Sequence, residues 1–308
     1  MLCLCCFVVL LCFKERGVIM LADLPDFNRI EKLHRATAPS EAAYNLIHCH
    51  CVVIATISWM IARHQNQLLA FKQLNLNENL ADFDDFENLA DFADKSQADV
   101  EQIMLRQMSK INEDLKNRCD LAKSCLKKLI DTNPLELPKV SGGIAPKDYV
   151  DEYAAFAGGL LHDIGTYFVL AKDGSKAADG KLEFDGPNYI LHGLRGYNYL
   201  IDNGFSEDIA QFARNHTGVG LTREQVVAQN LPLPAGDYIP RTVEQEIVMV
   251  ADKYNSKSIP PRFLTVDTYR RKAARFGEEN AKRWMCLVNK YGRVSVCKLA
   301  DFFGLKVD

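Results

Sequence analysis

The sequence has 308 residues, of which 48% are hydrophobic and 25% are charged, and its formal net charge is −3 at pH 7. With a mean hydropathy of −0.13, these values are typical of a soluble globular protein with one large domain or two. The slightly acidic balance gives no electrostatic basis for nucleic-acid binding, so no nucleic-acid partner is expected. Any anionic substrate must then be attracted by local features such as bound cations.

The N-terminal stretch MLCLCCFVVLLCF is uncharged and apolar, but it is shorter than the roughly 20 residues that span a membrane. The charges of KER follow this run, whereas a signal peptide carries positive charge before it. We expect residues 1–19 to be an apolar leader or a mis-assigned start, with a membrane-associated leader as the alternative and no stable membrane insertion. The remaining cysteines are scattered without a disulfide-type spacing, which favours reduced thiols and a cytoplasmic protein.

Helical periodicity runs through nearly the whole chain, and convincing alternating strand runs are missing. Ser40 followed by Glu41 marks the start of the first long helix. The pattern predicts an all-α fold, a helical bundle. The expected helices, in chain order, cover residues 40–74, 98–132, 149–171, 190–204, 206–217 and 243–257.

The segment 72–100 between the first two long helices is acidic and contains the hexamer ENLADF twice, at 78–83 and 87–92. Two copies are too few for a repeat architecture, so we expect a solvated insertion. A protein partner bound through this acidic insertion is the alternative. Loops are expected at 137–148, at 172–188 and at 231–240, the last placed over the entrance of the site.

The polar residues of greatest interest lie within apolar helical contexts. His162 and Asp163 are adjacent in AGGLLHDIGTYF, and Asp252 lies in the apolar stretch IVMVADKY. Burying such side chains costs free energy unless they share a partner. Histidine and aspartate side chains that project inward from separate helices are the ingredients of a metal site. The seven histidines are His34, His48, His50, His64, His162, His192 and His216, and we interpret His34, His48 and His64 as core residues.

The string GGLLHDIGT, with an upstream histidine in HCVVIATISWMIA and a downstream VADKY, resembles the HD-domain (HDIG) superfamily of metal-dependent phosphohydrolases. Residues 192–253 are similar to small HDIG-domain proteins of archaea and bacteria. The resemblance covers residues 40–64 and 148–255. It implies an all-α HD-domain bundle with a metal site in its core, which we place at residues 20–260, interrupted by the insertion and followed by a C-terminal helical extension at 261–308.

Carried over onto this sequence, the metal ligands of the family fall on a defined set of residues: His50, His162, Asp163 and Asp252. His192 and His216 match the additional histidines of members that hold two metals. Imidazole and carboxylate ligands together suit Mn, Fe, Co, Ni or Zn, whereas carboxylates alone favour Mg. We therefore expect one or two divalent metal ions. Thr166 stands where several members in nucleic-acid signalling have lysine, and the GYP motif is missing, which weakens an interpretation as a cyclic-dinucleotide phosphodiesterase.

The resemblance implies an enzyme that hydrolyses a phosphate ester of a nucleotide or another small phosphorylated metabolite, as a phosphomonoesterase or phosphodiesterase. His162 and Asp163 are the predicted catalytic residues, through a water activated by metal. Arg195, Arg214 and Lys253 are the predicted substrate-binding residues, because each lies near a predicted ligand and can bind phosphate. The alternatives are a di-iron oxygenase of the HD fold and a ligand-sensing regulatory HD module without catalysis.

Overall fold

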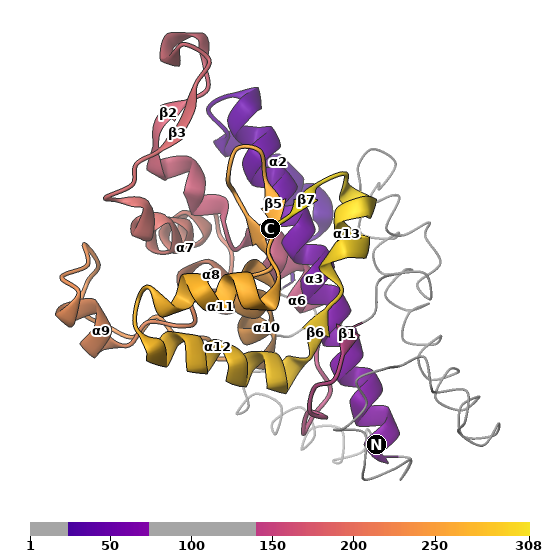
Figure 1. Ribbon diagram of the computed structural model, residues 1–308. Coiled ribbons are helices and arrows are strands. Elements are labelled where there is room, and N and C mark those ends of the chain that lie inside the picture. The colour runs from indigo at the N-terminus through magenta and orange to yellow at the C-terminus, as the bar shows by residue number, and fades with distance from the viewer. Residues whose placement is uncertain (1–23, 74–139) are drawn as a thin grey trace, which may run out of the picture.

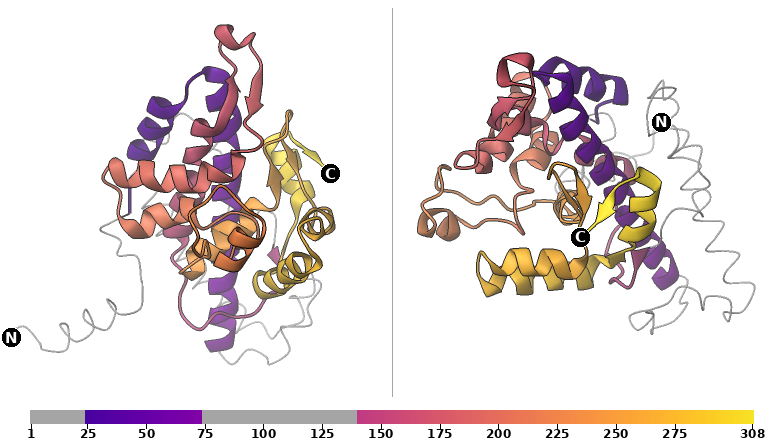
Figure 2. Two further views of the ribbon diagram at one scale, coloured as in Figure 1. Left: turned by 90° about the vertical axis from the view of Figure 1, so that its left-hand side faces the viewer. Right: turned by 45° about the horizontal axis from the view of Figure 1, so that its top comes forward.

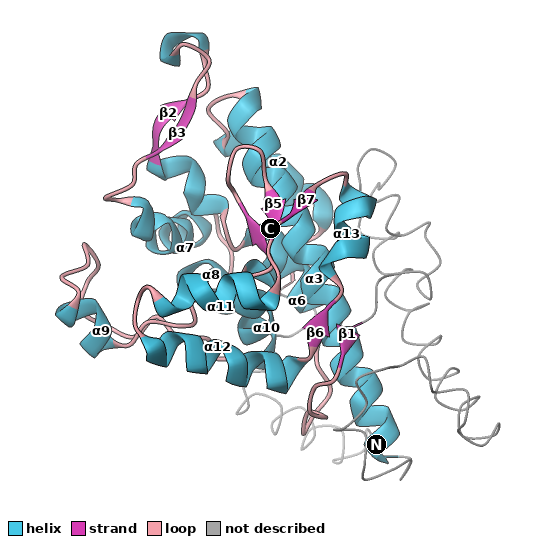
Figure 3. Cartoon of the chain, in the orientation of Figure 1, coloured by secondary structure: helices cyan, strands magenta, loops and turns pink. Residues whose placement is uncertain are grey.

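The computed structural model describes residues 24–73 and 140–308, and these form a mostly helical fold with a few short strands (Figure 3). This architecture confirms the predicted all-α bundle. The longer helices are α2 (Phe27–Thr37), α3 (Glu41–Gln73), α6 (Glu152–Leu161), α7 (His192–Asp202), α8 (Glu207–Arg214), α10 (Val243–Asp252), α11 (Val266–Ala274), α12 (Glu278–Tyr291) and α13 (Val296–Phe303).

Helix α3 is the central element of the bundle and runs through the molecule from one end to the other (Figure 1). By length and composition alone, its segment Glu41–Leu69 could cross a membrane, but 83% of the most apolar window is buried inside the fold. The apolar side chains of Ile54, Ile57 and Ile61 on this helix are fully buried. A helix that is apolar on most faces is typical of a core position, and α6 and α10 pack against it.

Helix α6 approaches α3 closely because glycine replaces a larger side chain at the contact. A Cβ atom on Gly159 would lie 2.6 Å from the Cα of Ala55, a distance that no real side chain tolerates. The helix begins at an N-cap, where the side chain of Asp151 accepts a hydrogen bond from the backbone N–H of Ala154. This close packing places the end of α6 beside the middle of α3.

The sequence pattern predicted one helix over 149–171, and this prediction is wrong. The α-helix ends at Leu161, with His162 as its C-cap, and a 3₁₀ helix (Ile164–Val169) follows. Strand β2 (Leu170–Asp173) then pairs antiparallel with β3 (Leu182–Phe184). The predicted loop at 172–188 is therefore largely a hairpin, which extends from the top of the molecule in Figure 1.

Further short strands tie the C-terminal part of the chain to the bundle. Strand β1 (Val140–Ser141) pairs with β6 (Arg293–Val294), and β5 (Arg262–Phe263) pairs antiparallel with β4 (Asn255–Ser256) and parallel with β7 (Lys306–Val307). Pairs of this length leave no alternating pattern in the sequence, which is why they were not predicted. The left view of Figure 2 shows α11, α12 and α13 gathered on one side of α3.

The C-terminal helices share the hydrophobic core of the molecule. Trp284 on α12 is fully buried, its ring packs edge-on against Tyr254 and Tyr269, and its indole N–H donates to the carbonyl of Val266. The short helix α9 (Arg223–Ala228) lies in a segment that extends to the left in Figure 1. Residues 1–19, nearly all of the acidic insertion and the predicted helix 98–132 lie outside the described residues.

Candidate metal centre

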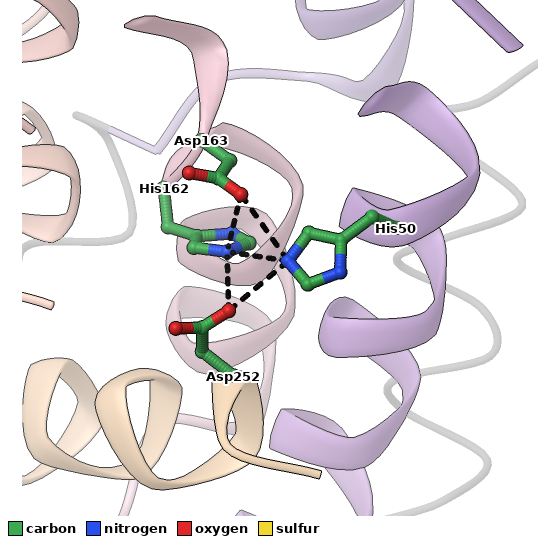
Figure 4. Close-up of side chains that lie close together, drawn as sticks. All are labelled: His50, His162, Asp163 and Asp252. Carbon is green, nitrogen blue, oxygen red and sulfur yellow. Dashed lines mark hydrogen bonds and ion pairs between the residues drawn. The ribbon is translucent and has the colours of Figure 1, made fainter. Parts of the chain in front are cut away.

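Four side chains from three helical segments meet beside the centre of α3 (Figure 4). His50 comes from α3, His162 and Asp163 from the end of α6, and Asp252 is the last residue of α10. Nε2 of His50 lies 3.2 Å from Oδ2 of Asp163 and 3.0 Å from Oδ1 of Asp252. One ligand atom from each of these residues lies within 4.8 Å of all the others, so together they could hold a metal ion.

A second group shares Asp163 with the first. Oδ1 of Asp163 lies 3.5 Å from Nε2 of His192 and 3.4 Å from Nε2 of His216. These three residues also meet the geometry of a metal-binding group, and all are buried. Because Oδ2 faces the first group and Oδ1 the second, the carboxylate of Asp163 lies between two adjoining positions for a cation.

The histidine rings are held with Nε2 pointing into the centre. Nδ1 of His162 bonds the carbonyl of Gly159 at 2.7 Å, and Nδ1 of His216 bonds that of Ala213 at 2.7 Å. Nδ1 of His192 bonds the carbonyl of Tyr189 at 2.5 Å. A carbonyl oxygen only accepts, so each Nδ1 donates its proton and a neutral ring keeps a lone pair on Nε2. This is the outer-shell arrangement that orients metal-binding histidines.

The Nε2 lone pairs of these rings lie close to one another and to the carboxylate oxygens of Asp163 and Asp252. Burial lowers the pKa of His162 to about 4 and that of His192 to about 3, so both rings are neutral at pH 7. Nε2 of His192 nevertheless lies 2.9 Å from Nε2 of His216. Two acceptors at this distance repel one another unless a proton or a cation lies between them. The chemistry of the donor set therefore fits a divalent transition metal.

Two buried carboxylates and two lysines give the centre its charge. The side chain of Asp163 is fully buried and that of Asp252 is 13% exposed. Burial alone would raise the pKa of Asp163, but the ammonium of Lys257 holds it well below its usual value. Lys253 pairs with Oδ2 of Asp252 at 2.6 Å, so Oδ1 of this carboxylate remains directed at the histidines.

The ligand atoms come mostly from the ends of helices. His192 is the first residue of α7, and His216 lies two residues beyond the end of α8, at Arg214. The expectation that His216 is part of the helix 206–217 is wrong. Of the predicted ligands, His50 lies well inside a helix.

The structure brings one of the three predicted substrate-binding residues to the centre. Nζ of Lys253 also donates to the carbonyl of His216 at 3.0 Å. Arg195 is exposed and bonds the carbonyl of Phe168. Arg214 bonds the carbonyl of Asp237 and lies over the ring of Tyr238, with its Cζ 4.3 Å from the ring centre. Among the described residues, neither arginine has a recorded interaction with the predicted metal ligands.

Three residues at the centre were not predicted to have a role there. Lys257 bonds Asp163, Asn255 bonds Nδ1 of His50 at 2.8 Å, and Oγ1 of Thr166 donates to Oδ1 of Asp163 at 2.9 Å. Thr166 had been noted in the sequence as a departure from lysine. Asn255 follows the VADKY motif directly and Lys257 is the third residue after it, and this proximity was the signal that could have identified them.

The other histidines lie apart from the centre and have partners of their own. His34 is fully buried between the carbonyl of Leu160 and the hydroxyl of Tyr167. His48 lies 2.9 Å from Glu31, and His64 bonds the carbonyl of Gly142. The interpretation of these three as core residues agrees with their positions.

The sequence comparisons agree with this geometry. Residues 130–256 match the HD domain family, and the chain therefore contains an HD domain, as the HDIG resemblance predicted. It is 36% identical over 103 residues to the uncharacterised protein MJ0778 of Methanocaldococcus jannaschii, covering 33% of this chain and 49% of that protein. No solved structure matches the chain at comparable significance.

Two further archaeal proteins are similar over shorter shares of their length. The tRNA (cytidine(56)-2'-O)-methyltransferase of Picrophilus torridus is 34% identical over 102 residues, which cover 33% of this chain and 24% of the enzyme. The enzyme of the same name from Thermoplasma volcanium is 29% identical over 150 residues, which cover 48% and 37%. The similarity thus spans at most about half the length of these three relatives.

Proposed function

We propose that this HD domain is a metal-dependent phosphohydrolase that acts on a nucleotide or another small phosphorylated metabolite. The observation that carries the proposal is the position of Asp163, whose two carboxylate oxygens face two separate groups of histidines. A carboxylate placed in this way suits a bridge between two ions. Paired ions of this kind would supply an activated water and positive charge at the phosphoryl group.

The residues of the chain would fix this centre and hold its charge. His50, His162 and Asp252 would hold one ion and His192 and His216 the other, with Asp163 shared. The carbonyls of Gly159, Tyr189 and Ala213 keep the rings in one orientation, so little reorganisation accompanies the reaction. Asp163, which both groups share, and His162, which precedes it in the first group, remain the proposed catalytic residues, and both are fully buried.

Among the proposed phosphate-binding residues, Lys253 has the strongest support. Its ammonium is nearly buried and lies against Asp252 and the backbone of His216. Arg195 and Arg214 would first have to release the carbonyls of Phe168 and Asp237. The two relatives named as methyltransferases match this chain over only 24% and 37% of their own length, and we propose no methyl transfer for this chain.

The test is release of inorganic phosphate from a panel of nucleotides and phosphorylated metabolites, with Mn, Co, Ni or Mg added in turn. The wild-type protein should hydrolyse members of the panel in a metal-dependent way, and Asp163→Asn should abolish the activity. His64→Gln is the matched control, because it alters a buried histidine outside the centre. Activity in Asp163→Asn equal to that of the wild type would overturn the proposal.

The same protein sample distinguishes the two other functions that the HD fold allows. Oxygen consumption by the iron-loaded protein, without phosphate release from any substrate, would indicate a di-iron oxygenase. Ligand binding without turnover of either kind would indicate a regulatory module. Each of these results would contradict the phosphohydrolase.

A further inference from the structure

A lysine side chain reaches into the first group of predicted ligands. Nζ of Lys257 donates to Oδ2 of Asp163 and lies 3.3 Å from Nε2 of His50. Both of these atoms belong to the set that could hold a metal ion. The side chain is only 9% exposed, and the ring centre of Tyr189 lies 6.0 Å from Nζ. The ammonium therefore lies among the ligands rather than at the rim of the centre.

An ammonium in this position and a metal ion exclude one another. The Nε2 atom of a neutral imidazole has one lone pair, which either accepts a hydrogen bond or binds a metal. Nδ1 of His50 is already bonded to Asn255, so Nε2 is the nitrogen that remains for either partner. A metal ion at His50 and Asp163 thus requires Lys257 to move away.

Lys253 differs from Lys257 although both neutralise a carboxylate of the centre. Nζ of Lys253 bonds Oδ2 of Asp252 and the carbonyl of His216. Oδ1 of Asp252, which faces His50 and His162, remains accessible to an ion. Lys253 therefore supplies charge without occupying a ligand atom of the first group, whereas Lys257 occupies two.

The position of Lys257 in the chain allows its side chain to withdraw. It directly follows β4, and the next three residues, Ser258, Ile259 and Pro260, are exposed before β5 begins. A lysine has a flexible four-carbon stem and is stable when its ammonium is in water. Withdrawal would therefore take the ammonium toward solvent along an exposed segment.

We propose that Lys257 is an internal counter-ion that fills the first metal position in the metal-free protein and is displaced when an ion binds. It stabilises the buried carboxylate of Asp163 through a direct ion pair. It also weakens the apparent metal affinity, because only the fraction of molecules with Lys257 withdrawn can bind. This proposal rests on the metal centre of the proposed function but not on its reaction.

The test compares Lys257→Met with Lys253→Met, since each removes one nearly buried positive charge beside the same centre. Mn²⁺ binding is measured by calorimetry on protein freed of metal by a chelator. Lys257→Met should bind Mn²⁺ about tenfold more tightly or better, as expected if the position is blocked most of the time. Lys253→Met should bind less tightly than Lys257→Met, because it removes charge but no competitor.

Thermal unfolding without metal provides the second readout. The metal-free Lys257→Met protein should melt several degrees below the metal-free wild type, and added Mn²⁺ should abolish this difference. Lys257→Gln, whose amide still donates to Asp163, serves as the variant if Lys257→Met does not fold without metal. Mn²⁺ affinity that is unchanged or weaker in the Lys257 variants would overturn the proposal.

Neither readout involves a substrate, so a failure of the phosphohydrolase assay leaves this test intact. Mn²⁺ binding to a Lys257 variant but not to the wild type would be the extreme form of the expected result. If neither the wild type nor Lys257→Met nor Lys253→Met binds Mn²⁺, this proposal and the metal centre on which it rests are both overturned.

Discussion

Oγ1 of Thr166 donates a hydrogen bond of 2.9 Å to Oδ1 of Asp163, the oxygen that faces His192 and His216. The backbone N–H of Thr166 also bonds the carbonyl of Asp163 at 2.9 Å. Two bonds between the same residues fix both the backbone and the carboxylate of Asp163. Thr166 thus orients a ligand that both groups of the centre share.

Replacing Thr166 by valine keeps the shape of the side chain and removes the bond to Asp163. We expect the affinity for Mn²⁺ to fall by about tenfold to hundredfold, as for other losses of a bond that orients a ligand. Calorimetric titration measures this affinity. Thr166→Ser keeps the hydroxyl and should bind nearly as well as the wild type. Equal Mn²⁺ affinities for the valine variant and the wild type would show that Asp163 is oriented without this bond.

Gly165 allows the segment after Asp163 to touch the start of α7. A Cβ atom at this position would lie 2.0 Å from the carbonyl oxygen of His192 and 2.3 Å from the backbone nitrogen of Gly196. Backbone atoms cannot rotate away, so Gly165→Ala must push α7 from the centre. We expect the free energy of unfolding in urea to fall by about 1–3 kcal/mol or more.

Gly186→Ala is the control for this substitution, because no atom lies within 4 Å of the Cβ that it would add. It should be as stable as the wild type or slightly more stable, since alanine restricts the unfolded chain. Equal unfolding midpoints for the two alanine variants would contradict the close contact between Gly165 and α7.

A carboxyl group far from the centre should control part of the pH dependence of stability. Glu152 is buried between the indole N–H of Trp59 and the amide of Asn66. Burial raises the pKa of Glu152 from 4.5 to about 7. The native protein therefore binds more protons than the unfolded chain between these values. The stability from this group is present below pH 4.5 and is lost as the pH rises through 7.

Glu152→Gln removes this titration. The unfolding free energy of the wild type, minus that of the variant, should decrease by about 3 kcal/mol from pH 4.5 to above pH 7, since one pKa unit corresponds to about 1.4 kcal/mol. Urea unfolding at a series of pH values measures the difference. Glu183→Gln, at an exposed glutamate, is the control and should show a flat difference. A flat difference for Glu152→Gln as well would contradict the buried, protonated carboxyl.

The sequence pattern predicted the helical bundle, and the family resemblance predicted the six residues that form the two groups at its centre. The apolar run after Ser40 predicted α3 within a residue or two at each end. His162, Asp163 and Asp252 are polar residues in apolar stretches of the sequence, and this combination indicated a shared partner. The assignment of the two groups depended on the order of residues known from the HD family, not on periodicity.

Other features of the centre could not be predicted, for identifiable physical reasons. The apolar pattern continues from α6 through the 3₁₀ helix into β2, so hydrophobicity does not mark the helix end at Leu161. Lys257 lies in a segment expected to be helical, and a lysine near a helix end is usually solvated. Its inward position depends on β4 and β5, which are each two residues long and leave no pattern in the sequence.

Asp163 is the residue that joins the two cation positions, and the metal content of the protein tests this role most directly. The measurement is the metal-to-protein ratio, determined by elemental analysis after saturation with Mn²⁺ and removal of the excess. We predict about two ions per chain for the wild type and about one for His192→Gln or His216→Gln. Asp163→Asn should retain almost none, while the His64→Gln control should match the wild type. A wild-type ratio near one in the fully active protein, or an unchanged ratio in Asp163→Asn, would contradict the account.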